Sequence, residues 1–234
     1  MVQAIILDFY GTLAETRDWG PSWEELVREL GYELPPDVRD RWWNDGIDGT
    51  EHDEHSRSRD HYVAWQQSRV RRMLDECAVT RSDQDLLIAR VREIGAHRNI
   101  DAYDEVITVL AELRGRGFTL AICSNWDWDL VEALDAAGLA GAVDVTISSA
   151  WVGARKPHPR IYTHTIEQLD ISPADALFVG DTWTCDVEGP RAAGMQPVYL
   201  RRPHLDIDKT APAGHRDEPD VHFASTLADI LPLL

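Results

Sequence analysis

The stretch Ala4-Ile5-Ile6-Leu7-Asp8-Phe9-Tyr10-Gly11-Thr12-Leu13 decides the fold. It opens with a short apolar run and continues into a carboxylate and a glycine turn, which is typical of a fully buried strand in a parallel sheet. Such a strand would deliver Asp8 to the carboxyl edge of the sheet, where α/β folds bind their ligands. Because a buried carboxylate is costly without a partner, we expect a cation, a lysine or several backbone N–H groups beside Asp8.

Composition limits the class of protein. The chain has 234 residues, 44% of them hydrophobic, which is enough apolar material for one large domain or for a core domain with a smaller one. Its formal net charge of -18 argues against nucleic acid or an anionic membrane as a partner. Cys77, Cys123 and Cys185 lack Cys-x-x-Cys spacing, so we expect free thiols. With no leader pattern and no membrane-spanning apolar run, the sequence predicts a cytoplasmic protein.

Hydrophobic periodicity divides the chain into two parts. Residues 21–96 carry apolar residues three or four apart and no strand signal, which predicts helices at 23–30, 61–74 and 83–94. After Ala102, helices alternate with expected strands at 119–123, 145–147, 176–179 and 197–200. We therefore predict an α/β protein whose core, residues 1–16 and 99–234, is a doubly wound, Rossmann-like parallel sheet. Residues 17–98 would form a separate helical domain, hinged near Arg17 and Asn99.

Polar residues stand at the ends of three predicted strands. Asp8 follows the first strand, Ser124 and Asn125 follow the second, and Asp181 follows the fourth. Because parallel strands place their carboxyl ends at one edge, these side chains should converge there. In such a site Asp8 would attack a substrate, and Ser124 would help to hold an oxyanion. Lys156 would balance negative charge, while Asp8 and Asp181 would share a Mg²⁺ ion.

These residues belong to four segments that resemble, in order, the motifs of the haloacid dehalogenase superfamily. The resemblance covers nearly the whole chain, and the helical insertion is similar to the cap domain that closes over the site in that superfamily. It implies a hydrolase with Asp8 as nucleophile and, in the phosphatases, an essential Mg²⁺. The segments are Asp8-Phe9-Tyr10-Gly11-Thr12, Ser124-Asn125, Lys156-Pro157 and Gly180-Asp181-Thr182-Trp183-Thr184-Cys185-Asp186.

The resemblance also implies a set of metal ligands and supporting residues. Asp8, the backbone carbonyl of Tyr10 and Asp181 match the ligands of the magnesium ion. Asp186 matches a second acid that binds the metal through water or pairs with the motif lysine. Thr12 matches the residue that steadies the turn after the nucleophile.

Catalysis and phosphate binding are implied in the same way. Ser124, Asn125 and Lys156 match the groups that bind the phosphate, and Lys156 also matches the catalytic cation that orients Asp8. Tyr10 stands at the position of the general acid in the catalytic machinery.

Tyr10 is where this chain departs from the phosphatases of the superfamily. They carry a second Asp at that position, which protonates the leaving oxygen and then activates water. Tyrosine, with an ordinary pKa near 10, is poorly matched to that task near neutrality. The haloacid dehalogenases resemble this chain here, because a halide leaving group needs no proton. Their Lys-Pro motif is also followed by a tyrosine, where this chain has Tyr162.

The fourth motif favours the opposite conclusion. The dehalogenases have Ser and Asn where this chain has Gly180, Asp181 and Thr182. Two close carboxylates, Asp8 and Asp181, require a cation between them. We therefore rank a Mg²⁺-dependent hydrolase of small phosphate esters above a metal-free 2-haloacid dehalogenase. A binding or regulatory descendant with low turnover is the third hypothesis.

Two groups of side chains leave alternatives open. We expect loops beside the predicted site to contain Trp126, Trp128, Trp151 and Trp183, which could line an aromatic pocket or pack in the core. His52, His55 and His61 could be interpreted as a metal site, but we expect structural or surface roles for them.

Overall fold

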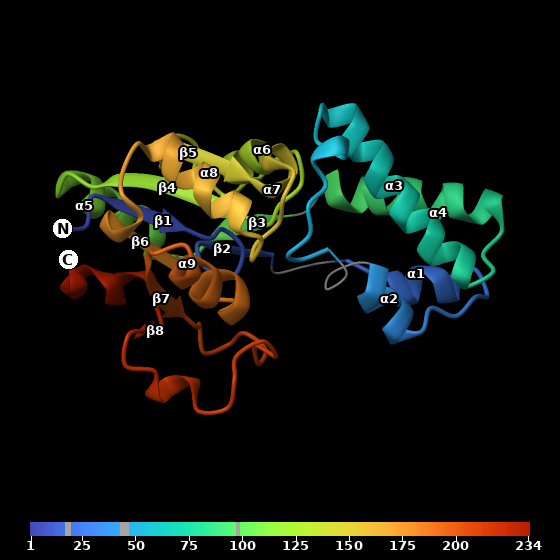
Figure 1. Cartoon of the computed structure of the whole chain (residues 1–234). Helices are drawn as coiled ribbons and strands as arrows, with labels where there is room; N and C mark the ends of the chain where they lie inside the picture. The colour runs from blue at the N-terminus through green and yellow to red at the C-terminus, as the bar shows by residue number, and fades with distance from the viewer. Residues whose placement is uncertain (17–19, 43–46, 97–98) are drawn as a thin grey trace.

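The computed structural model describes residues 1–16, 20–42, 47–96 and 99–234. The hinge expected near Arg17 and the domain limits expected at residues 17 and 98 therefore lie outside the described residues. Figure 1 shows a body built on a sheet, with both termini at its far end, and a second body made of helices.

The sheet has the predicted parallel architecture, with β1 (Ala4–Leu7) in its interior. The strand order is β5-β4-β1-β6-β7-β8, and all five pairings are parallel. The last strand was not predicted, because a three-residue strand with two exposed positions leaves no apolar pattern. The other strands are β4 (Thr119–Ser124), β5 (Val145–Ser148), β6 (Ala176–Gly180), β7 (Gln196–Leu200) and β8 (His222–Ala224).

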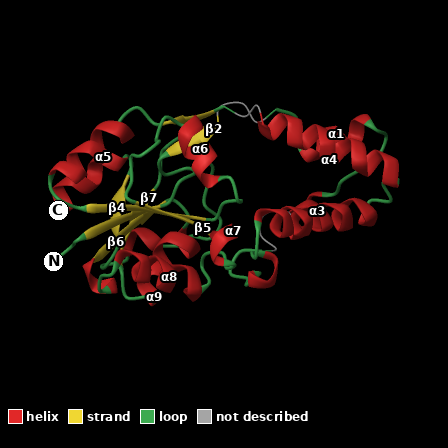
Figure 2. Cartoon of the chain, turned by 90° about the horizontal axis from the view of Figure 1, so that it is seen from above, coloured by secondary structure: helices red, strands yellow, loops and turns green. Residues whose placement is uncertain are grey.

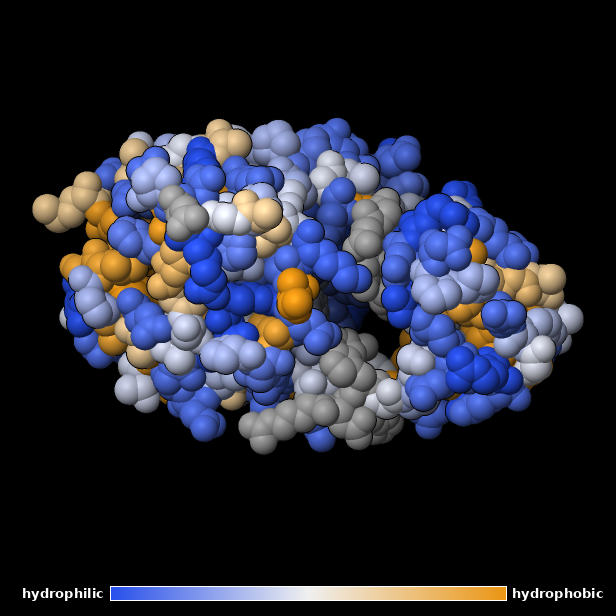
Figure 3. Space-filling view, turned by 90° about the horizontal axis from the view of Figure 1, so that it is seen from below, coloured by the Kyte–Doolittle hydropathy of each residue, from blue (hydrophilic) through white to orange (hydrophobic). Residues whose placement is uncertain are grey.

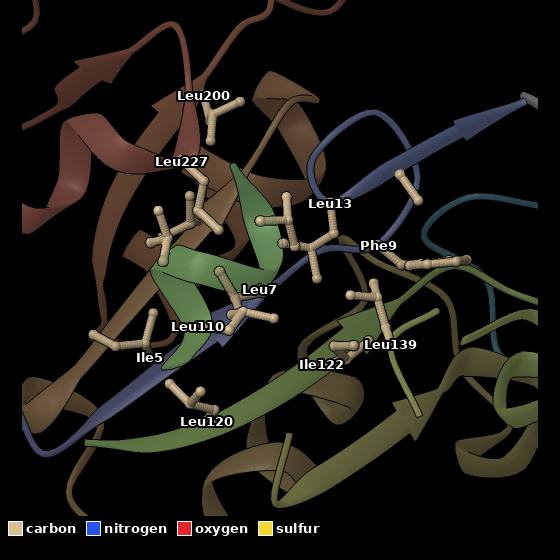
Figure 4. Packing of buried hydrophobic residues seen from close by; sticks show 14 of the residues in the cluster. Ile5, Leu7, Phe9, Leu13, Leu110, Leu120, Ile122, Leu139, Leu200 and Leu227 are labelled. Atoms are coloured by element: carbon tan, nitrogen blue, oxygen red, sulfur yellow. The ribbon is translucent and has the colours of Figure 1, made fainter. Parts of the chain in front are cut away.

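Helices cover both faces of the sheet, as Figure 2 shows. Successive residues of β1 point to opposite faces. Ile5 and Leu7 pack with Leu110 of α5 in one apolar cluster (Figure 4), whereas Ile6 packs with Ile161 of α8 in another. Burial on both sides explains why the strand is apolar without alternation. The helices of this body are α5 (Val106–Gly115), α6 (Leu130–Ala136), α7 (Ser149–Val152), α8 (Pro159–Leu169) and α9 (Gly189–Ala192).

The second body comprises the four helices between β2 and β3, and it has an apolar cluster of its own. That cluster contains Leu26 of α1, Met73 and Leu74 of α3 and Leu87 of α4. The helices are α1 (Trp23–Glu29), α2 (Pro36–Trp42), α3 (Arg59–Glu76) and α4 (Arg81–Ala96).

A pair of short strands that the sequence did not predict connects the two bodies. β2 (Ala14–Thr16) and β3 (Ile100–Ala102) pair antiparallel beside the turn that follows Asp8. Each strand has three residues, which is too short for alternation to be visible in the sequence. The pair places Thr16 and Ile100, which flank the insertion in the sequence, opposite each other.

Short helical turns complete the chain, at Asp53–His55, Pro173–Asp175, His215–Asp217 and Leu227–Leu233, with a π-helical turn at Trp183–Glu188. The three cysteines are free thiols, as predicted. Among the described residues, no helix combines the length and the apolar content that crossing a membrane requires.

Candidate active site

The predicted residues converge at the carboxyl edge of the sheet. Asp8 directly follows β1, Ser124 ends β4, and Asp181 directly follows β6. Asp8 is only 6% exposed, and its Oδ1 accepts hydrogen bonds from Ser124 Oγ at 2.9 Å and from Lys156 Nζ at 2.7 Å. The lysine reaches this carboxylate from the loop before α8, so residues far apart in sequence form one site.

Lys156 bridges two buried carboxylates. It is 1% exposed, and its Nζ lies 2.7 Å from Asp8 Oδ1 and 2.6 Å from Asp186 Oδ1. Burial by itself lowers the pKa of Lys156, but the negative charges of Asp186 and Asp8 outweigh it and hold that pKa well above its ordinary value. Burial raises the pKa of Asp186 to about 6, against the opposing effect of Lys156. The lysine is therefore a permanent positive charge beside Asp8.

Asp181 completes a cluster of three carboxylates. One oxygen each from Asp8, Asp181 and Asp186 lies within 4.8 Å of the others. Burial, followed by the charges of Asp8 and Asp186, raises the pKa of Asp181 well above its ordinary value, although Arg201 Nη1 lies 3.0 Å from Asp181 Oδ2. Carboxylate oxygens are the donors that Mg²⁺ prefers, and the strain between these negative charges is what a divalent cation would relieve. The donor set fits that metal.

The turn after Asp8 is shaped by a glycine. Gly11 has a φ of +83°, and a Cβ on it would come within 2.5 Å of the Asp181 carboxylate. The next residue, Thr12, is fully buried, and its backbone oxygen accepts a hydrogen bond from Arg202 Nη2 at 2.7 Å. The turn after β1 therefore lies directly against the Asp181 carboxylate.

Tyr10 lies two residues after Asp8, and its side chain bonds to the short strand β2. Its hydroxyl accepts a hydrogen bond from the backbone N–H of Thr16 in β2 at 3.0 Å. Its ring stacks on that of Trp126, with the ring centroids 6.2 Å apart. The side chain therefore supports the structure of this edge while it lines the site.

Asn125 holds the backbone of Lys156 from both sides of its amide. Its Nδ2 donates to the Lys156 carbonyl oxygen at 2.9 Å, and its Oδ1 accepts from the Lys156 N–H at 2.7 Å. The same Nδ2 lies 3.1 Å from Asp48 Oδ1, which belongs to the helical insertion. The amide of Asn125 thus fixes the lysine loop and links it to the insertion.

Residues 47–56 of the insertion, which we call the docking segment, pair with the loop before Lys156. Glu51 and Ala154 form an antiparallel bridge. Around it, the Gly49 N–H donates to Lys156 O at 3.1 Å, the Arg155 N–H to Thr50 O at 3.1 Å, and the His52 N–H to Gly153 O at 2.7 Å. The insertion therefore contacts the backbone of Lys156 directly.

A pocket of about 370 Å³ opens at this place. Figure 3 shows that the surface is hollowed between the two bodies and that mainly hydrophilic residues border the hollow. None of the tryptophans that the structure describes lines the pocket, where Tyr10 supplies an aromatic ring. The lining residues are Asp8, Tyr10, Asp48, Ser124, Asn125, Arg155, Lys156, Asp181, Thr182, Cys185 and Asp186.

The sequence alone did not identify three charged residues at this site. Arg155 and Asp48 line the pocket as an ion pair with Nε to Oδ1 at 3.0 Å, and Arg201 pairs with Asp181. Arg201 directly follows β7, so the rule that strand ends meet at one edge could have found it. Nothing in the sequence indicates the pairing of Asp48 with Arg155.

The side chains whose roles the sequence left undecided pack against or bond to other residues. His52 and His55 both stack on the ring of Trp65, with centroids 4.8 Å and 5.0 Å away. His61 lies in the first turn of α3, where its N–H donates to Ser58 Oγ at 3.3 Å. Trp183 is 1% exposed and packs edge-on against Tyr199.

Comparison with known proteins places this geometry in a family. The sequence model of a family described as haloacid dehalogenase-like hydrolase matches residues 2–194. The human protein named haloacid dehalogenase-like hydrolase domain-containing protein 3 is 36% identical over 125 residues, which are 53% of this chain and 48% of that protein.

Relatives with named activities fall into two groups. A phosphoserine phosphatase of Thermus thermophilus is 38% identical over 106 residues, covering 45% of this chain and 43% of that enzyme. An (S)-2-haloacid dehalogenase of a Pseudomonas species is 32% identical over 145 residues, covering 61% of this chain and 60% of that enzyme. The chain thus spans between 43% and 60% of the length of these three relatives.

Solved structures agree on the fold. A phosphatase from Thermococcus onnurineus superposes with a TM-score of 0.57 at 22% identity, covering 99% of this chain and 97% of that chain. An L-2-haloacid dehalogenase from Xanthobacter autotrophicus superposes with a TM-score of 0.61 at 21% identity, covering 100% and 98%. Fold similarity therefore does not separate the two activities.

Proposed function

Because the chain belongs to the haloacid dehalogenase-like hydrolase family, we propose that it is a Mg²⁺-dependent phosphatase of small phosphorylated metabolites. The observation that carries this proposal is the cluster of three carboxylates, Asp8, Asp181 and Asp186, with oxygens within 4.8 Å of one another. Lys156 compensates Asp8 and Asp186, and Arg201 meets Asp181 from one side. Burial raises the pKa of Asp181, and the charges of Asp8 and Asp186 raise it further against Arg201 and Lys156, which supports a cation beside this cluster.

Each site residue has a distinct part in the proposed hydrolysis. Asp8 attacks phosphorus while the P–O bond to the alcohol breaks, and the leaving alkoxide takes a proton from solvent. Water then hydrolyses the aspartyl phosphate, which releases inorganic phosphate and restores the Asp8 carboxylate. Lys156 Nζ holds the attacking carboxylate through its 2.7 Å hydrogen bond to Asp8 Oδ1. Ser124 Oγ, which lies 2.9 Å from the same oxygen, binds the phosphate. When bound by Asp8, Asp181 and the Tyr10 carbonyl, Mg²⁺ would supply positive charge to the transferring group. Asp186 holds Lys156 through the 2.6 Å contact between Nζ and Oδ1, and Thr12 steadies the turn after Asp8.

We assign the helical insertion, residues 17–98, to a cap domain and residues 1–16 and 99–234 to the catalytic core. The support for this division is that the insertion has its own apolar cluster and that its docking segment adjoins the pocket. The cap would exclude bulk water and select the substrate.

The test is hydrolysis of a panel of phosphate esters and 2-haloacids, with Mg²⁺ and with EDTA. We expect phosphate release that EDTA abolishes and that Asp8→Asn removes. The matched control is Asp144→Asn, a carboxylate that pairs with Arg114 on the surface and should retain full turnover. Full activity of Asp8→Asn would overturn the assignment of the nucleophile.

A metal-free 2-haloacid dehalogenase is the second candidate, and Tyr10 and Arg201 favour it. Tyrosine replaces the acid that phosphate esters need, and Arg201 offers Asp181 a cation that belongs to the chain. Halide release that is indifferent to EDTA would establish this activity in place of the phosphatase. If no substrate reacts, the third hypothesis, a binding or regulatory descendant, replaces both enzymes.

The variant Tyr10→Asp tests whether the missing acid limits turnover. If the site hydrolyses phosphate esters, we expect kcat for poor leaving groups to rise about tenfold or more, because general acid catalysis typically contributes 10²–10⁴-fold. Esters with good leaving groups should gain much less. An unchanged kcat in a variant that folds and binds Mg²⁺ would show that the site is not organised for phosphate esters.

A further inference from the structure

The cationic side chains around the pocket differ in how many of their hydrogen-bond donors already bond to protein groups. Lys156 is bonded to two carboxylates, and Arg201 Nη1 binds both the carboxylate and the backbone oxygen of Asp181. Arg155 instead donates its Nε to Asp48 Oδ1 at 3.0 Å, and neither of its terminal Nη atoms bonds to any residue that the structure describes. Its side chain is 13% exposed and lines the pocket. The Nη atoms of Arg155 are therefore available as hydrogen-bond donors at the pocket.

Arg155 is also held in a fixed place. Its backbone N–H pairs with Thr50 O at 3.1 Å, within the bridge between the docking segment and the lysine loop. Asp48 Oδ1 receives Asn125 Nδ2 as well as Arg155 Nε, so the carboxylate that orients the guanidinium is itself oriented. A binding group that is positioned before the ligand arrives loses little conformational freedom on binding.

We propose that Arg155 forms a second anion site, and that the substrate carries another anionic group, a carboxylate or a second phosphate, besides the phosphoryl group that reacts. A guanidinium with free Nη atoms suits a planar carboxylate or a phosphate, which it can bind through two hydrogen bonds. Asp48 is the positioning residue of this site. The inference rests on the proposed phosphatase function, which assigns the other end of the pocket to the reacting phosphate.

Binding of phosphonates that the enzyme cannot hydrolyse tests the site without turnover. Phosphonoacetate and methylphosphonate differ by one carboxylate, and their dissociation constants can be measured by calorimetry at pH 7.5 in saturating Mg²⁺. We expect the protein to bind phosphonoacetate about tenfold to a hundredfold more tightly, the usual range for a hydrogen-bonded charged pair. Arg155→Met should lose this preference, and Arg90→Met, which removes an exposed arginine paired with Glu29, should keep it.

A double variant separates loss of Arg155 from exposure of Asp48. Asp48→Asn/Arg155→Met removes both charges, so it tests the arginine without leaving an unpaired carboxylate in the pocket. We expect the preference to be absent in it too, with thermal unfolding confirming that each variant is folded. The proposal would be overturned if the double variant still prefers phosphonoacetate. It would also be overturned if the unmodified protein prefers neither phosphonoacetate nor methylenediphosphonate to methylphosphonate.

Comparison of the ligands identifies the second group. Tighter binding of phosphonoacetate assigns the site to a carboxylate, and tighter binding of methylenediphosphonate assigns it to a phosphate. Failure of this proposal and failure of the proposed function give different results. A preference that depends on Arg155 without any phosphatase activity would reject the phosphatase and retain the anion site, and phosphatase activity without the preference would do the reverse.

Discussion

At the scale of single residues, the site is a problem in compensating buried charge. Lys156 is the one side chain that contacts both Asp8 and Asp186 with hydrogen bonds among the described residues. Removing one member of a buried ionic group leaves the other charges uncompensated, and this costs more than the group contributes when it is intact. We therefore expect the stability of the fold and the proposed reactivity of Asp8 to depend on the same ammonium group.

The variant Lys156→Met tests this dependence. Because it leaves Asp8 and Asp186 buried without their cation, we expect the free energy of unfolding to fall by about 3–5 kcal/mol at pH 7.5 in urea titrations without metal. Lys156→Met/Asp186→Asn should recover part of the loss, because one of the two charges is then absent. A loss below about 1 kcal/mol would mean that water or relaxation compensates the pair.

Single residues also show what the sequence could and could not reveal about the site. Asp8, Ser124 and Asp181 were predictable as neighbours because each stands at the end of a buried parallel strand, and topology brings such ends together. Asp48 and Arg155 are 107 residues apart and belong to no strand end, so no periodicity or spacing relates them. Their contact exists because the insertion folds back onto the lysine loop.

At the scale of elements, the docking segment is the least predictable part of the chain. It has neither helical nor strand periodicity, and its order comes from backbone bonds to residues 153–156. His52 is its buried anchor, 3% exposed, with Nδ1 3.0 Å from Ser56 Oγ and an Nε2 that has no partner among the described residues. Strands β1, β4, β6 and β7 were predictable because their apolar runs are long enough to be distinctive.

His52 should make the stability of this segment depend on pH. Burial, together with the positive charge of Arg155, lowers the pKa of His52 from 6.5 to about 4. The unfolded chain therefore takes up a proton that the folded chain refuses, so this contribution is complete above about pH 6.5 and is lost as the pH falls towards 4. From pH 7.5 to pH 5 the expected loss is about 2 kcal/mol.

Urea titrations at these two pH values, on the unmodified protein and on His52→Gln, measure that loss. Other groups titrate equally in both proteins, so the difference between them isolates the histidine. The histidine has no such role if both proteins lose the same stability between the two pH values.

At the scale of the whole molecule, the chain contains apolar clusters of two kinds. Those on the two faces of the sheet combine residues of β1 with residues that follow the insertion in the sequence. The one in the insertion draws on α1, α3 and α4 together with neighbouring loops. Local unfolding follows such clusters, because each can lose its packing with limited cost to the others.

Met73→Ala tests whether the insertion opens as a separate unit. Met73 is fully buried, so its truncation should destabilise the insertion by about 2–5 kcal/mol. We expect hydrogen exchange to become faster in α1, α3 and α4 while β1 and β4 stay protected. Ile122→Ala, equally buried in the sheet, is the control and should accelerate exchange throughout the sheet-based body. Equal acceleration everywhere in Met73→Ala would show that the two bodies unfold together.

The contact between the docking segment and residues 153–156 has a consequence for protein engineering. Transplanting this insertion into another hydrolase of the family would leave its backbone donors and acceptors facing a loop that did not evolve to receive them. The transferable module is therefore discontinuous: the insertion, the lysine loop and Asn125, which joins them. A chimera designed on sequence boundaries alone would separate the docking segment from the lysine loop with which it pairs.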